Sequence, residues 1–200
     1  MKNQPLNYMR YSGQPNYCLM RKKIFRAIHS GGLIAYPTEA VWGFGCSPDN
    51  EIALHRLLLL KKRSWHKGVI LVTGSVTHIE KELRALPSHA EAECREKWPG
   101  HFTFLLPDVQ QRFSYLVKGQ FDTVAIRVSQ HPFIQWYSQN IAPFLVSTSA
   151  NLSRKSPARY YWQLVHRFKN DIDFVVPGRT LGATSPSRII DPVSGECLRS

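Results

Sequence analysis

Residues 33–45 read LIAYPTEAVWGFG, an apolar segment that runs into a proline, a threonine and a glutamate. Residues 33–36 predict a short buried strand that ends at Pro37, because the residue before a proline favours extended backbone. The Thr38 hydroxyl and the Glu39 carboxylate would then lie at the carboxyl end of this strand, where open α/β sheets bind ligands. The alternative is a simple turn in which Thr38 bonds its own backbone.

The segments around this strand predict an alternation of helices and strands. Asn16 is a candidate N-cap for one helix, and Asp49 or Asn50 caps a second one, whose basic end is residues 61–63. We expect further helices over 76–85, 88–98 and 132–140, strands over 69–73, 101–106, 123–128 and 144–148, and an irregular, strand-rich tail after about residue 150. The pattern indicates an α/β fold with a twisted mixed sheet.

The length and composition suit one domain with a short appendage. The 200 residues are 43% hydrophobic, which is enough to build a core. Residues 1–16 are polar and contain no apolar signal-like run, so we expect a flexible N-terminal extension there and a single domain over residues 17–200. The longest apolar run, residues 57–60, is too short for a membrane span, and four isolated cysteines fit a reducing compartment. We therefore expect a cytoplasmic location.

The charge balance favours a polyanionic partner. The chain has 26 Lys and Arg against 14 Asp and Glu, a net charge of +12. Such an excess is typical of proteins that bind nucleic acids or nucleotide phosphates, and a basic protein without such a partner is the alternative. The common nucleotide motifs are missing, since there is no GxxxxGK[ST] and Pro48 stands where a fingerprint starting at Gly43 needs its third glycine. No His or Cys cluster has metal-ligand spacing.

Three further segments place polar or charged groups beside apolar strands. Residues 61–68, KKRSWHKG, carry cations that could clamp a triphosphate or form an ordinary solvated helix end. Arg127 lies between apolar neighbours and needs an anionic partner, either structural or a substrate carboxylate. Residues 146–153, VSTSANLS, could bind phosphate, hold a substrate or merely cap a helix.

The order of these motifs resembles the YrdC family in its short, single-domain bacterial form. The resemblance spans roughly residues 17–199 and rests on YPTEAVWGFG, KKR…KG, WPGHFTF, VAIRV, STSANLS and PSRIID…CLR. It implies a twisted mixed sheet with flanking helices around a large basic cavity. It also implies a nucleotidyltransferase that condenses L-threonine, bicarbonate and ATP to threonylcarbamoyl-AMP and pyrophosphate. A partner threonylcarbamoyl-transferase machinery would then modify tRNA beside the anticodon.

The resemblance also assigns roles by position. The substrate threonine would contact Thr38, Arg127, Ser147 and Ser187. ATP would contact Lys61, Arg63, Lys67, Thr123, Ser149, Asn151 and Arg199, of which Lys61, Arg63, Ser149 and Asn151 would be catalytic. Cationic clamps and hydroxyl donors suit a reaction that positions two anions and neutralises charge at phosphorus. Mg²⁺ would accompany ATP, with no tightly bound, protein-ligated metal.

The chain departs from the family pattern at several positions. His101-Phe102 replaces a usual proline and small apolar residue, and residues 67–68, Lys-Gly, replace an Asn-Pro or Lys-Pro common in longer relatives. Arg154 replaces a usual glycine, and Arg188 a usual threonine or glutamate. These two extra cations would strengthen phosphate or RNA binding, or simply lie in solvent.

Two other functions remain open at this point. One is a non-catalytic, double-stranded RNA- or rRNA-binding ribosome-maturation protein that uses the same basic concavity, whose affinity would follow total charge and fall steeply with salt. The other is a carbamoyltransferase domain of the hydrogenase-maturation type. Such domains occur in longer proteins with acylphosphatase and zinc-finger-like parts, which this sequence does not display.

Overall fold

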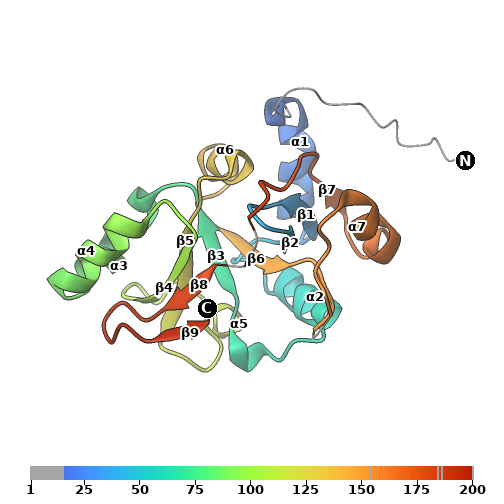
Figure 1. Ribbon diagram of the computed structural model, residues 1–200. Coiled ribbons are helices and arrows are strands. Elements are labelled where there is room, and N and C mark those ends of the chain that lie inside the picture. The colour runs from blue at the N-terminus through green and yellow to red at the C-terminus, as the bar shows by residue number, and fades with distance from the viewer. Residues whose placement is uncertain (1–15, 154, 184, 186, 200) are drawn as a thin grey trace, which may run out of the picture.

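A mixed sheet of nine strands forms the centre of the protein (Figure 1). The computed structural model describes residues 16–153, 155–183, 185 and 187–199. Within them the strand order is β7-β1-β2-β6-β3-β5-β4-β8-β9. The strands are β1 (Ile34–Pro37), β2 (Trp42–Gly45), β3 (Ile70–Thr73), β4 (Phe102–Pro107), β5 (Thr123–Val128), β6 (Leu145–Ser149), β7 (Phe174–Val175), β8 (Arg188–Ile190) and β9 (Cys197–Arg199). Because β3 is parallel to β5 but antiparallel to β6, the predicted mixed sheet is confirmed.

Helices cover both faces of this sheet. In Figure 1, α1 and α6 lie on one side, and α2 and α5 lie on the other. The helices are α1 (Tyr17–His29), α2 (Glu51–Lys61), α3 (Glu80–Arg84), α4 (Ser88–Lys97), α5 (Tyr115–Lys118), α6 (Pro132–Asn140) and α7 (Tyr161–Phe168), with 3₁₀ turns η1 (Trp65–Lys67) and η2 (Val76–Ile79). The side chains of Asn16 and Asn50 accept the backbone N–H groups of Cys18 and Ala53, so both predicted caps form, and Asn50 rather than Asp49 caps α2.

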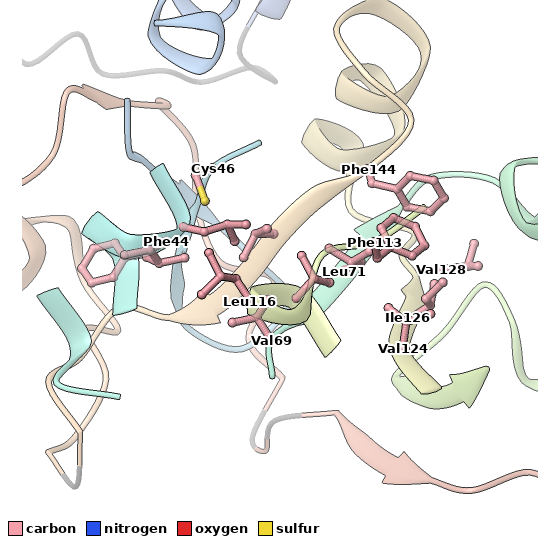
Figure 2. Packing of buried hydrophobic residues seen from close by; sticks show 14 of the residues in the cluster. Phe44, Cys46, Val69, Leu71, Phe113, Leu116, Val124, Ile126, Val128 and Phe144 are labelled. Atoms are coloured by element: carbon pink, nitrogen blue, oxygen red, sulfur yellow. The ribbon is translucent and has the colours of Figure 1, made fainter. Parts of the chain in front are cut away.

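Alternate residues along the strands build two separate cores. Leu71 belongs to the larger one, which Figure 2 shows together with Phe44, Val124 and Ile126. Val72, the next residue, belongs to the second core, where α1 and α6 pack against the opposite face. This division follows from the two-residue period of a strand, which sends neighbouring side chains to opposite faces.

Strand β6 joins the two halves of the sheet. Its first residues pair with β3, with Leu145 opposite Val72 and Ser147 opposite Ile70. Its last two residues pair with β2, where Ser149 lies opposite Gly43. The hydroxyls of the predicted STSANLS motif therefore leave the sheet at the junction between its halves.

Two elements, β2 and α7, were not predicted from the sequence, whereas the tail does contain strands, namely β7, β8 and β9. Residues 42–45 form β2, which pairs antiparallel with β1, because the turn at residues 38–41 is tight enough to return the chain as a hairpin. The tail after residue 150 contains α7, whose apolar Leu164 and Phe168 lie four residues apart on its buried face. Arg154 and residues 1–15 of the predicted extension lie outside the described residues. Among the helices that the structure describes, none has the length and apolar character of a membrane span.

Candidate functional site

A cavity of about 580 Å³ lies on the face of the sheet that also carries the second core. Tyr36, Val72 and Ile134 belong to that core and also form part of the cavity wall. The structure brings all the residues assigned to ATP or threonine to this one cavity: Thr38, Lys61, Arg63, Lys67, Thr123, Arg127, Ser147, Ser149, Asn151, Ser187 and Arg199. Residues that are up to 161 positions apart in the chain therefore share one wall, since Thr38 and Arg199 both line it.

Strand β5 explains why an arginine enters this cavity from an apolar segment. Val124 and Ile126 point into the larger core, whereas Thr123, Ala125 and Arg127 line the cavity. The sequence VAIRV therefore alternates between the two faces of the sheet. The same alternation in β6 directs Ser147 and Ser149 to the cavity, with Val146 in the core.

Arg63 and Arg199 are each held by one edge of the guanidinium group. Arg63 donates Nε and Nη2 to the carbonyl of Gly68 at 3.1 and 3.0 Å. Arg199 donates the same two atoms to the carbonyl of Ser187 at 3.0 and 2.6 Å. Within the described part of the chain, neither Nη1 atom has a hydrogen-bond partner. Each arginine therefore keeps an oriented donor group for an anion.

Arg127 is fixed by three acceptors. Its Nε donates to the carbonyl of Gly100 at 3.0 Å, and its Nη2 donates to His101 Nδ1 at 3.1 Å. The same Nη2 lies 2.9 Å from Glu39 Oε1, which also accepts the Ser129 hydroxyl at 2.7 Å. The predicted anionic partner of the buried arginine is therefore Glu39, which neutralises part of its charge inside the protein.

Lys61 is not the solvated helix end that its position in the sequence allowed. Its side chain is buried, and its Nζ donates to the carbonyls of Ser149 and Asn151 at 2.5 and 2.8 Å and to Asn151 Oδ1 at 2.8 Å. The Ser149 hydroxyl also donates to Asn151 Oδ1, at 2.6 Å. The ammonium group thus holds the loop after β6 in place with all three of its N–H groups.

Positive charge dominates the cavity. Its described lining holds Lys61, Arg63, Lys67, Lys118, Arg127 and Arg199 against one carboxylate, that of Glu39. Burial and the nearby charge of Arg63 lower the pKa of Lys61 to about 8. Burial also lowers the pKa of Arg199, and the charges of Arg63 and Arg127 lower it further. An anion in the cavity would relieve this mutual repulsion.

Two polar residues of the cavity that contact assigned ones, Tyr36 and His101, were not predicted, and Glu39 was expected only as a carboxylate at the ligand-binding end of the first strand. The buried Tyr36 donates its hydroxyl to Ser147 Oγ at 2.6 Å, and burial raises its pKa, so that the phenol stays a donor. Glu39 and His101 orient Arg127. Tyr36 could have been found because it lies two residues before Thr38 and so shares its face of the strand. His101 stood out only as a departure from the family pattern.

Two further predictions concern Thr38 and Arg188. The Thr38 hydroxyl donates to the carbonyl of Val41 at 2.7 Å, so the local turn that was the alternative reading does form, although Thr38 also lines the cavity. Arg188 is exposed in β8 and is not among the residues that line the cavity. Within the described residues, no group of three or more His, Cys, Asp or Glu side chains is placed to hold a metal ion.

Comparison with known proteins places this chain in a family. The Sua5/YciO/YrdC family model, described as "Telomere recombination", matches residues 26–200. Threonylcarbamoyl-AMP synthase of Marinobacter nauticus is 45% identical over 174 residues, which cover 87% of this chain and 92% of that protein. The protein of the same name from Hahella chejuensis is 40% identical over 178 residues, 89% of this chain and 96% of the other.

Solved structures agree with this match. Sua5 of P. abyssi in complex with L-threonine superposes with a TM-score of 0.78 at 26% identity, covering 86% of this chain. The chain spans 51% of that Sua5 chain, about half its length. E. coli YciO, at 20% identity and a TM-score of 0.78 over 93% of this chain, shares the fold. The chain thus belongs to the Sua5/YciO/YrdC family.

Proposed function

We propose that this protein is a threonylcarbamoyl-AMP synthase, which condenses L-threonine, bicarbonate and ATP to threonylcarbamoyl-AMP and pyrophosphate. The relatives at 40–45% identity carry that name over more than nine-tenths of their length. The observation that carries the proposal is the convergence of the eleven predicted residues on one basic cavity. Its volume, about 580 Å³, falls within the range of small-molecule sites.

The three arginines suit a reaction between anions. Arg63, Arg127 and Arg199 are each oriented by a backbone carbonyl before any substrate binds. Donors that are already oriented need no rearrangement when negative charge develops at phosphorus or on the leaving pyrophosphate. Both the carboxylate of threonine and the phosphates of ATP can be held in this way, so proximity supplies part of the rate enhancement.

The residues that line the cavity are assigned to two proposed partners, and the bond from Arg199 to Ser187 connects the two sets. We assign threonine to Thr38, Arg127, Ser147 and Ser187, since Arg127 offers a fixed cation and Ser147 is held by Tyr36. We assign ATP to Lys61, Arg63, Lys67, Thr123, Ser149, Asn151 and Arg199, with Lys61, Arg63, Ser149 and Asn151 closest to the reacting phosphate. Lys61 would act there mainly by its charge and by shaping the loop of Ser149 and Asn151.

ATP would enter this cavity as its complex with Mg²⁺. Glu39 is the one carboxylate among the described lining residues, and its Oε1 is bonded to Arg127 and Ser129. A carboxylate cage for Mg²⁺ is therefore not offered by the lining, and the phosphates and water would supply most ligands. The product would pass to a transferase acting on tRNA, and we place this reaction in the cytoplasm.

A pyrophosphate-release assay tests the proposal. Purified protein with ATP, Mg²⁺, bicarbonate and threonine should release pyrophosphate, and omission of threonine should abolish the release. Arg63→Ala should lower the rate by about a hundredfold, because a preoriented donor to the reacting phosphate is removed. Arg84→Ala is the matched control, since the Arg84 side chain is 77% exposed and lies outside the cavity. Equal losses in the two variants, or release without threonine, would contradict the proposal.

A further inference from the structure

His101 connects Arg127, in the cavity wall, to Ser185, which lies far from it in the sequence. Its Nδ1 lies 3.1 Å from Arg127 Nη2, on β5. Its Nε2 lies 2.6 Å from the carbonyl oxygen of Ser185, in the segment before β8. The ring also lines the cavity. One imidazole therefore contacts both the arginine assigned to threonine and the carboxyl-terminal segment.

The two partners determine the protonation of this ring. A guanidinium group can only donate, so Nδ1 must accept the hydrogen bond from Arg127. A carbonyl oxygen can only accept, so Nε2 must carry the proton. Both contacts are satisfied together only by the neutral imidazole with its proton on Nε2. The charged groups that face the ring are Arg127 and, through it, Glu39.

His101 also decides which part of Arg127 is available to a ligand. Of the five N–H groups of the guanidinium, Nε–H is bound to Gly100 and one N–H of Nη2 is bound to His101, while Nη2 also lies 2.9 Å from Glu39 Oε1. The two N–H groups of Nη1 have no hydrogen-bond partner within the described residues. With its other edge held at three points, the arginine can present only Nη1 to the cavity.

We propose that His101 is a positioning residue for threonine binding, which orients Arg127 through Nδ1 while it holds the Ser185 carbonyl through Nε2. This rests on the proposed function, because it deepens the role of Arg127 at that site. Removal of the Nδ1 acceptor would leave an N–H group unmatched on a side chain that is only 11% exposed. Arg127 would then turn away from its binding orientation to satisfy that group.

Two substitutions separate the two ends of the ring. An asparagine places its amide near the position of Nδ1, and a glutamine places its amide near the position of Nε2. His101→Asn can therefore still accept from Arg127 but cannot reach Ser185. His101→Gln can still donate to Ser185 but offers Arg127 no acceptor. His89→Gln, on the exposed face of α4, is the matched control.

Steady-state kinetics and hydrogen exchange then read the two contacts separately. His101→Gln should raise the KM for threonine by about tenfold with the KM for ATP unchanged, whereas His101→Asn should stay within about twofold of the wild type. His101→Asn should instead speed amide exchange at Leu181 and Ala183, whose N–H groups bind the carbonyls of Thr38 and Glu39. Equal KM values for threonine in the two variants would overturn the proposal.

The failure of this inference can be told apart from failure of the proposed function. If the wild type makes no product, the proposed function is wrong. The role of His101 can still be tested in that case, by comparing the wild type and the two variants in their threonine affinity, measured by calorimetry, and in their amide exchange at Ala183. If the wild type is active and both variants bind threonine as it does, the function stands and the role of His101 is wrong. An equal rise in the threonine KM in both variants would indicate a merely structural ring and would also overturn the proposal.

Discussion

Single residues of the cavity are held by backbone carbonyls more than by other side chains. Arg63, Arg127 and Arg199 each donate Nε to a main-chain oxygen, which leaves the opposite edge of the guanidinium toward the cavity. Gly68, the acceptor for Arg63, has a φ of +56°, which a proline cannot adopt. A Cβ at position 68 would also lie 2.7 Å from the carbonyl oxygen of Lys118. Both facts explain why this chain has glycine at position 68, where longer relatives often have proline.

The charge of Lys61 makes nucleotide binding depend on pH. Its pKa of about 8 lies below the usual value for lysine, so the ammonium is charged below pH 8 and loses its proton as the pH rises through that value. ATP binding, measured by calorimetry without threonine, should therefore weaken by up to about tenfold between about pH 7.5 and 9. Lys61→Gln should bind more weakly and show no such dependence. A wild-type affinity that is the same at both pH values would refute this role.

At the scale of elements, the strands explain both what could be predicted and what could not. The sequence TVAIRV predicts β5 with its full bounds, and the apolar neighbours of Arg127 indicate a buried cation that needs an anion. The partner could not be predicted, because Glu39 and Arg127 are brought together only by the pairing order of the sheet. The hairpin of β1 and β2 was missed since its turn, TEAV, contains neither glycine nor asparagine.

Helix α2 carries Lys61 at its end, so its N-cap should matter for stability. Asn50 Oδ1 accepts the N–H of Ala53 at 2.9 Å, whereas the exposed Asp49 side chain caps nothing in the described structure. Asn50→Ala should lower the free energy of unfolding by about 1 kcal/mol in urea denaturation, and Asp49→Ala by clearly less. The reverse order of the two variants would show that the cap has been assigned to the wrong residue.

At the scale of the whole molecule, the basic excess has two possible uses. The net charge of +12 includes the six cations of the described cavity lining together with basic residues outside the cavity. The cavity cations act on a bound nucleotide at short range, whereas surface cations attract any polyanion through a field that salt screens. Substrate turnover and general RNA binding should therefore respond to different residues.

RNA binding through surface charge should not depend on the residues of the cavity. Asn151→Ala removes a group that shapes the phosphate loop but leaves the net charge unchanged, so threonine-dependent turnover should fall by about a hundredfold. Its affinity for double-stranded RNA, measured by filter binding over a series of salt concentrations, should match the wild type in value and slope. A parallel loss of RNA affinity and turnover would favour the RNA-binding alternative.

How far the site could be predicted depends on the range of the contacts. The eleven assigned residues were found because their motifs occur in a specific order along the chain. The hydrogen bonds around these residues could not be predicted, because their partners lie far apart in the sequence. His101 and Ser185 are separated by 84 positions, and Lys61 and Asn151 by 90. Hydrogen bonds of that range follow from the packing of the whole sheet and leave no local pattern in the sequence.

The identity of the product tests the central claim most directly. The protein should be incubated with ATP, Mg²⁺, L-threonine and ¹³C-labelled bicarbonate. The nucleotides should then be separated quickly and their masses measured by mass spectrometry. If the protein synthesises threonylcarbamoyl-AMP, the products will include an adenylate that contains threonine and one labelled carbon. Its formation should require threonine and bicarbonate together, and Arg63→Ala should slow it by about a hundredfold. ATP consumption that yields only ADP or AMP, with no labelled carbon in any adenylate, would contradict the account.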